Sequence, residues 1–155
     1  MDHDISYNSI IWLHGNDILL SPNMQREKLF LQHGTVSVYE HSFAVARLCL
    51  VMAFSLHIQI DERSLVRGAL LHDYFLYDWH IPDRTHRWHG FTHARCALEN
   101  ALKEFPLGKI EKDMIETHMF PLGLNIPRYR ESFIICIADK ICASCETLSV
   151  MPRKP

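Results

Sequence analysis

An imidazole and a carboxylate, His72 and Asp73, directly follow the apolar run Gly68-Ala69-Leu70-Leu71, at the end of a helix that the sequence predicts from about Asp61. Ala69 and His72 share one stripe of that helix, and Asp73 lies on the neighbouring stripe. Polar groups on an apolar helix face are costly to bury unless they hydrogen-bond or bind a cation. The chain must therefore fold in a way that brings partners to this pair.

Helix signals recur along the rest of the chain. Ser37 and Glu40 have the spacing of a capping box, Asp61 can cap the next helix, and Pro106-Leu107-Gly108 and Pro121-Leu122-Gly123 end two more. No segment alternates apolar and polar residues over the length of a strand, and no repeat recurs. The sequence predicts an all-α fold, a compact single-domain bundle of about six to seven helices, with the main helices over about 38–57, 61–73, 91–105, 109–119 and 129–150.

The first third of the chain has weaker signals. Apolar residues followed by Gly15-Asn16-Asp17 indicate a short helix, a turn and a second short piece within residues 5–20. Ser21-Pro22 is a helix opening, and we expect that helix to run up to His33-Gly34. At 155 residues the chain fits one domain, so we expect a single domain over 1–155, with a motif-bearing core over about 35–150 and an N-terminal helical extension, 1–34, packed on it.

The net charge and the cysteines narrow the range of partners and compartments that the sequence predicts. A formal net charge of -2 gives no reason to expect a nucleic acid polymer or an acidic membrane as partner. The most apolar run, Phe43 to Ile58, is too short to span a bilayer and carries Arg47. The five cysteines lie within helical patterns and indicate reduced thiols, although Cys142 and Cys145 leave a zinc or redox role open. With no secretory signal in the sequence, we expect a cytoplasmic protein, and the oligomeric state stays open.

Four more polar residues stand where they can face the pair, each on a separate predicted helix: His41, His93, His118 and Asp139. A single inward histidine is more often a hydrogen-bonded core residue than a ligand. So many costly groups in one small core indicate a shared purpose, and a divalent cation would satisfy them together. Imidazole and carboxylate without thiolate suit iron, manganese, zinc, nickel or cobalt.

The local contexts of these residues carry a family resemblance. Tyr39-Glu40-His41-Ser42, Ala69-Leu70-Leu71-His72-Asp73 and Ile137-Ala138-Asp139-Lys140 resemble the motifs of the HD-domain superfamily of metal-dependent phosphohydrolases, over about residues 35 to 150. The resemblance implies an HD-domain fold and a hydrolase of phosphoric ester bonds that uses metal-activated water. It also implies one or two divalent ions as cofactors.

The resemblance further implies ligand sets, because some members carry two more histidines between the doublet and the last aspartate. One ion would be held by His41, His72, Asp73 and Asp139, and a second by Asp73, His93 and His118. Asp73 would be the shared ligand and the catalytic residue at which the attacking water is held. His89 lies close enough to His93 to compete for its place, although its position before Gly90 favours a loop.

The substrate is the least constrained part of the hypothesis. We expect a small phosphorylated metabolite or nucleotide, with Arg84, Arg87 and Lys140 as candidate phosphate-binding residues, although a solvated loop or surface role explains them equally well. The doublet continues Tyr74-Phe75-Leu76 rather than isoleucine, glycine and lysine, which argues against the cyclic-dinucleotide phosphodiesterase branch. Two alternatives remain: a di-iron oxygenase of the same superfamily, and a metal-binding regulatory module without turnover.

Overall fold

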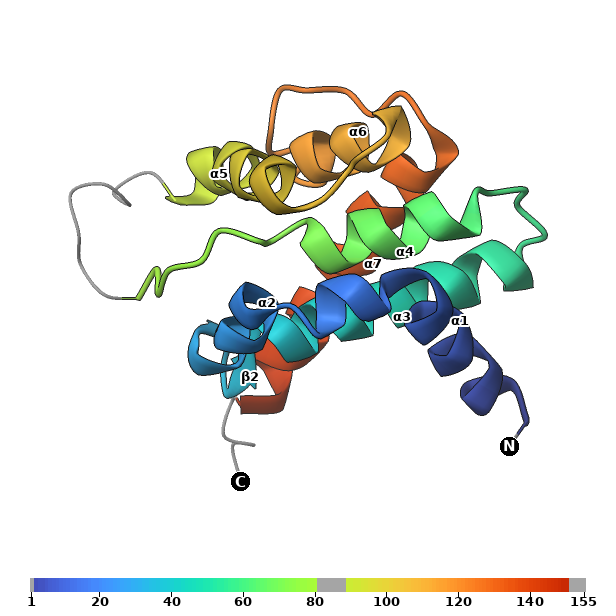
Figure 1. Ribbon diagram of the computed structural model, residues 1–155, viewed down its shortest axis with the longest axis horizontal. Coiled ribbons are helices and arrows are strands. Elements are labelled where there is room, and N and C mark those ends of the chain that lie inside the picture. Colours follow the sequence, from blue (N-terminus) through green and yellow to red (C-terminus); the bar gives the residue numbers. More distant parts are fainter. Residues whose placement is uncertain (1, 81–88, 151–155) are drawn as a thin grey trace.

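Helix α4 (Glu62–Leu71) is the centre of the molecule in the computed structural model, which describes residues 2–80 and 89–150. It contacts five other helices: α1 (Asp2–Leu19), α3 (Val38–Ser55), α5 (His89–Glu104), α6 (Lys109–Thr117) and α7 (Arg130–Val150). In Figure 1, α5 and α6 lie on one side of α4, and α1 and α3 lie on the other. The predicted all-α class is confirmed, with seven α-helices in the described part of the chain.

The predicted caps start the two helices that matter most. Ser37 Oγ accepts a hydrogen bond from the backbone N–H of Glu40, and Glu40 Oε2 accepts one from the N–H of Ser37, which closes the capping box before α3. Asp61 Oδ1 accepts a hydrogen bond from the N–H of Ser64 and starts α4. These bonds fix the positions at which the chain enters α3 and α4.

The prediction of a turn at Gly15-Asn16-Asp17 is wrong, because α1 runs without interruption through these residues. The glycine serves packing instead. A β-carbon on Gly15 would overlap Leu70 Cδ1, so the missing side chain lets α1 lie against α4. Close approach of a neighbouring helix is as good a reason for glycine as a turn is.

The helix predicted from Pro22 to His33 is also shorter than expected. Helix α2 covers Pro22–Arg26, a 3₁₀ turn, η1, covers Glu27–Leu29, and a small antiparallel hairpin follows. Its strands are β1 (Leu31–His33) and β2 (Val36–Ser37), joined through Gly34 with φ of 61°. Strands this short show no alternation in sequence, so the hairpin was not predictable from pattern.

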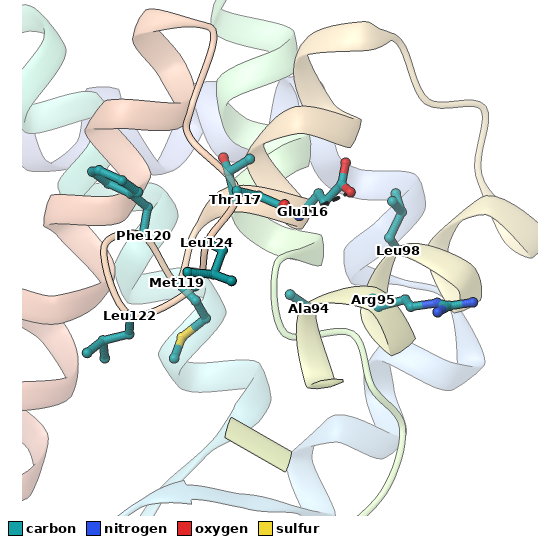
Figure 2. Close-up of a pocket in the computed structure, with 11 residues that line it drawn as sticks. Ala94, Arg95, Leu98, Glu116, Thr117, Met119, Phe120, Leu122 and Leu124 are labelled. Atoms are coloured by element: carbon teal, nitrogen blue, oxygen red, sulfur yellow. Dashed lines mark hydrogen bonds between the residues drawn. The ribbon is translucent and has the colours of Figure 1, made fainter. Parts of the chain in front are cut away.

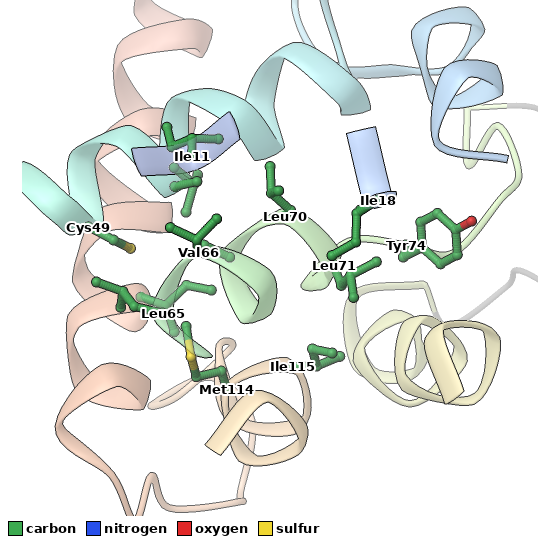
Figure 3. Close-up of a cluster of buried hydrophobic side chains, with 14 of the residues drawn as sticks. Ile11, Ile18, Cys49, Leu65, Val66, Leu70, Leu71, Tyr74, Met114 and Ile115 are labelled. Atoms are coloured by element: carbon green, nitrogen blue, oxygen red, sulfur yellow. The ribbon is translucent and has the colours of Figure 1, made fainter. Parts of the chain in front are cut away.

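The apolar core surrounds α4 and continues past its last turn to Tyr74. In Figure 3, Leu65, Val66, Leu70 and Leu71 of α4 lie among side chains from α1, α3 and α6. Tyr74, just beyond the helix, is also buried. His72 and Asp73 therefore enter a region where water is already excluded. None of the helices in the described residues has the length and hydropathy that a bilayer-spanning segment needs.

Candidate metal centre

Five helices bring the predicted histidines and aspartates into one buried cluster. Each is at most 8% exposed, and the cluster consists of His41 in the first turn of α3, His72 and Asp73 at the end of α4, His93 in α5, His118 at the end of α6 and Asp139 in α7. Their donor atoms form two groups that share Asp73, each compact enough to hold one ion.

The first group contains His41, His72, Asp73 and Asp139. Asp139 Oδ1 lies 3.1 Å from His41 Nε2 and 3.7 Å from His72 Nε2. Asp73 Oδ2 lies 3.3 Å from His72 Nε2 and 3.8 Å from His41 Nε2. Donors bonded to one zinc-like ion at about 2.1 Å are roughly 3 to 3.5 Å apart. The spacing of this group is close to that value.

The second group uses the other oxygen of the same carboxylate. Asp73 Oδ1 lies 3.4 Å from His93 Nε2 and 3.4 Å from His118 Nε2, and the two imidazole nitrogens are 2.9 Å apart. The two oxygens of Asp73 thus face different donor sets. A carboxylate in this arrangement can bridge two cations.

Hydrogen bonds donated by Nδ1 set the orientation of three of the four rings. Nδ1 of His72 lies 2.8 Å from the Ala69 carbonyl oxygen, and Nδ1 of His118 lies 2.8 Å from the Ile115 carbonyl oxygen. A carbonyl only accepts, so Nδ1 must carry the proton and the Nε2 lone pair must face the cluster. Nδ1 of His41 donates in the same way to Glu146. These are the tautomers that a metal ligand requires.

The repeated pattern at His72 and His118 has a local cause. Each residue is the C-cap of its helix, α4 or α6, and each ring bonds the carbonyl three residues earlier. Carbonyls in the last turn of a helix lack intrahelical partners. The imidazoles satisfy one of these carbonyls with one nitrogen and point the other nitrogen into the cluster.

The acidic and basic groups of the cluster stabilise one another's charged forms. Burial alone would lower the pKa of His41, but hydrogen bonds to Asp139 and Glu146 outweigh it and raise this pKa to about 9. Burial alone would raise the pKa of Asp73, but the charge of His72 and the nearby imidazoles of His118 and His93 hold it well below its usual value. The pKa of Asp139 is also lowered, against burial, by His41 and His72. Two ionised carboxylates thus attract positive charge, whether it comes from protons or from metal ions.

Two buried donor atoms of the cluster itself lack a hydrogen-bond partner among the described residues, and they test whether a metal fits the site. His72 Nε2 and Asp73 Oδ1 are both without one, and each faces one of the two donor groups. Leaving such atoms unsatisfied in a dry interior is unfavourable. Both can act as metal ligands, and the donor set of imidazoles and carboxylates suits a divalent transition metal. The residues fit the cofactor that the sequence predicts.

Sequence reasoning did not find four further residues that contact the cluster or interact with its charges: Glu27, Gln32, His33 and Glu146. Glu146 had a signal, because it follows Asp139 by seven residues and so lies on the same face of α7. The other three come from η1 and β1. Their positions depend on the placement of a hairpin that has no local sequence signal.

The predicted substrate residues give a mixed result. Lys140 Nζ donates to the His118 carbonyl at 2.9 Å and is 4.0 Å from Asp139 Oδ2, so it braces the cluster from α7. Its role toward a substrate stays a prediction. Arg84 and Arg87 lie outside the described residues. His89, for which a loop seemed favoured, is the first residue of α5.

A pocket of about 520 Å³ lies between α5 and the end of α6 (Figure 2). It is lined by residues next to the ligands in sequence, Ala94 of α5 and Thr117 of α6, and by the chain that follows α6. Arg95 and Glu116 are its charged residues. None of the six clustered histidines and aspartates lines it. The pocket therefore lies near the cluster but is not lined by its side chains.

Comparison with known proteins gives one match. The family model of the HD domain matches residues 38–144, which is more than half of the chain and contains all six clustered residues. Gln32 and Glu146 lie outside the matched range. No curated protein and no solved structure matches the chain.

Proposed function

The chain belongs to the HD-domain family, and from this premise we propose that it is a metal-dependent phosphohydrolase that cleaves a small phosphorylated metabolite or nucleotide with water. His41, His72, Asp73 and Asp139 would hold one ion, and Asp73, His93 and His118 a second. Members of this family include proteins without turnover, so metal binding and hydrolysis have separate tests.

The arrangement of Asp73 carries the proposal. Its Oδ2 faces His41 and His72, and its Oδ1 faces His93 and His118. Two divalent ions held in this way would lower the pKa of a water molecule and offset the charge on the attacking and leaving oxygens of the phosphoester. The burial of Asp73 strengthens its electrostatic interactions, because water does not screen them.

The charge of the donor set supports an anionic substrate. With neutral imidazoles, the negative charges come from the two carboxylates, Asp73 and Asp139. Two divalent cations would exceed these charges, so the loaded centre would keep a net positive charge. A phosphoester dianion is attracted to such a centre, whereas a neutral metabolite gains nothing from it.

Metal analysis of purified variants tests the ligand sets. Protein prepared without chelator or affinity histidines should contain up to two ions per chain. Asp73→Ala should lose both, and His93→Ala should keep one. His14→Ala is the control, because His14 lies on α1 beside Glu62 and outside both groups. Full metal content in Asp73→Ala would show that Asp73 is not a ligand shared by two ions.

A turnover screen tests the reaction itself. We expect phosphate release from a phosphoester panel with manganese or another redox-inert ion, and no release by Asp73→Ala. Dioxygen uptake by the iron-loaded protein, without phosphate release, would instead support the oxygenase alternative. Tight metal binding without either reaction would support the regulatory module.

A further inference from the structure

The hairpin that precedes α3 lies outside the residues that match the family model. One of its side chains nevertheless reaches the cluster. Gln32 Nε2, on β1, donates to Asp73 Oδ2 at 2.5 Å, and the side chain is 6% exposed. The carboxylate that faces both donor groups is thus held by an amide from the N-terminal segment. The hydrogen bond also fixes which oxygen of Asp73 faces which group.

The strand is irregular at this point. In a regular strand successive side chains point to opposite faces, yet the ring of His33 packs edge-on against His41 at a centroid distance of 5.4 Å while Gln32 reaches Asp73. The pairing of β1 with β2 shifts register between Leu31 and His33. Bulges next to active sites commonly redirect a side chain in this way. Here the irregularity allows neighbouring residues to contact the same cluster.

The Oε1 atom of the Gln32 amide distinguishes a functional role of this side chain from a packing role. Oε1 is buried and has no hydrogen-bond partner among the described residues. Carboxylates only accept, so the donation to Asp73 identifies the group as NH₂ and the orphan as the carbonyl oxygen. The hairpin has other anchors, such as the bond from the Val38 N–H to the Phe30 carbonyl. Anchoring therefore explains one end of the amide and leaves the other without a partner.

We propose that Gln32 is a positioning residue of the centre, whose Nε2 holds Asp73 and whose Oε1 accepts a hydrogen bond from the attacking water. This rests on the proposed hydrolase function. The amide is uncharged over the whole working pH range, so it takes no proton from the water and forms no covalent bond. It orients the water beside Asp73 and leaves the chemistry to the loaded centre.

Cobalt(II)-loaded protein provides a test that needs no substrate, because its absorption bands report the arrangement of the ligands, water included. Gln32→Leu should still bind cobalt but with a changed spectrum and about 10- to 100-fold lower affinity, as for other residues that orient ligands. Turnover should lose kcat by a similar factor with little change in KM, because the lost contact orients the water and not the substrate.

Gln25→Leu is the matched control. Gln25 is half-buried in the same segment, and its amide donates to the Leu19 carbonyl at 2.6 Å, away from the cluster. Its loss should lower stability without changing the cobalt spectrum or kcat. Should Gln32→Leu fail to fold, Gln32→Asn keeps the amide but shortens its reach, and should show the same spectral change.

The outcomes separate this inference from the hydrolase proposal. Turnover by the wild type tests the hydrolase by itself. If the wild type turns over and Gln32→Leu matches it in kcat, cobalt affinity and spectrum, Gln32 only packs and the inference is overturned. If the wild type shows no turnover, the hydrolase proposal fails, and an unchanged cobalt spectrum in Gln32→Leu would overturn the inference as well.

Discussion

Glu146 shows how one carboxylate can prepare a ligand. Its side chain is 12% exposed, and Oε2 lies 2.8 Å from His41 Nδ1, opposite the nitrogen that faces the cluster. We expect Glu146→Ala to lower metal affinity about 10- to 100-fold, because the ring loses the partner that fixes its tautomer. Glu146→Gln should lose less, since its amide oxygen can still accept the hydrogen bond from Nδ1–H. Competition with a chromogenic chelator would measure both.

The control for Glu146 is Glu99→Gln, which removes an exposed carboxylate that pairs with Arg95 on α5. Its metal affinity should match the wild type. Equal affinities for Glu146→Ala and Glu99→Gln would show that the bond to His41 does not contribute to the site.

Glu27 gives a pH-dependent prediction. It is 1% exposed, and burial, opposed by the bond from the Leu76 N–H and reinforced by Asp73, raises its pKa to about 8. The folded state therefore keeps a proton that the unfolded chain releases above about pH 4.5, so this contribution to stability falls as pH rises toward 8. Glu27→Gln stays neutral and can still accept from Leu76. Its free energy of unfolding should match the wild type near pH 5 and exceed it near pH 8.

Urea unfolding in the presence of a chelator, at several pH values, would measure this difference. The slope of the wild-type free energy against pH should be steeper than that of Glu27→Gln, by at most about 1.4 kcal/mol per pH unit. Parallel curves would mean that Glu27 titrates alike in the folded and unfolded chain.

At the scale of elements, α4 and α6 are held at close range by Gly68. A β-carbon there would lie 2.5 Å from Met114 Sδ and 3.0 Å from Met114 Cβ. The sulfur can move, but the β-carbon moves only with its helix. Gly68→Ala should therefore destabilise the fold by about 1–3 kcal/mol, despite the gain of about 1 kcal/mol in helix propensity. Metal affinity should fall as well, because His72 and His118 end these two helices.

A double-mutant cycle isolates the contact between Gly68 and Met114. Met114→Ala alone leaves a cavity, but combined with Gly68→Ala it makes room for the new methyl group, so the two losses should not add. Gly123→Ala is the control, because its β-carbon would meet nothing nearer than Met119 Cβ at 3.4 Å. Additive losses in urea unfolding would argue that the helices adjust to the methyl group.

Local signals decided which elements could be predicted. The capping box at Ser37 and Glu40 and the cap at Asp61 act within one turn, so the sequence is enough to locate α3 and α4. Gly15 was misread, because its role depends on Leu70, far along the chain. The hairpin after α2 escaped prediction for the same reason.

The residues of the candidate site also fall into those that local sequence signals predict and those that they do not. The six clustered residues lie on inward faces of helices or directly at their ends, so helical periodicity was enough to predict that they point inward. The structure places them together. That they bind metal remains a proposal. Gln32 and Glu27 lie on β1 and η1, and only tertiary packing brings them to Asp73 and Leu76. No spacing in the sequence reveals such contacts.

At the scale of the whole molecule, the cluster connects elements that the chain separates. Its residues lie in α3, α5 and α7 or at the ends of α4 and α6, and four of these helices surround α4. The N-terminal hairpin adds its own contact through Gln32. A cation bound at the centre would therefore stabilise the association of most of the fold, and a cluster without one must balance its carboxylates with protons.

Metal binding should accordingly raise the thermal stability of the entire domain in one transition. A ligand at about 100 times its Kd adds about 2.7 kcal/mol, which for a chain of this length corresponds to a Tm increase of about 5–10 °C. Scanning calorimetry with manganese or zinc, and again with chelator, would measure it. Asp73→Ala should lose this increase. Asp17→Ala should instead lower Tm with and without metal, because it leaves the buried Arg67 without its ion pair, yet keep the full metal-induced increase. An undiminished increase in Asp73→Ala would place the stabilising ion elsewhere.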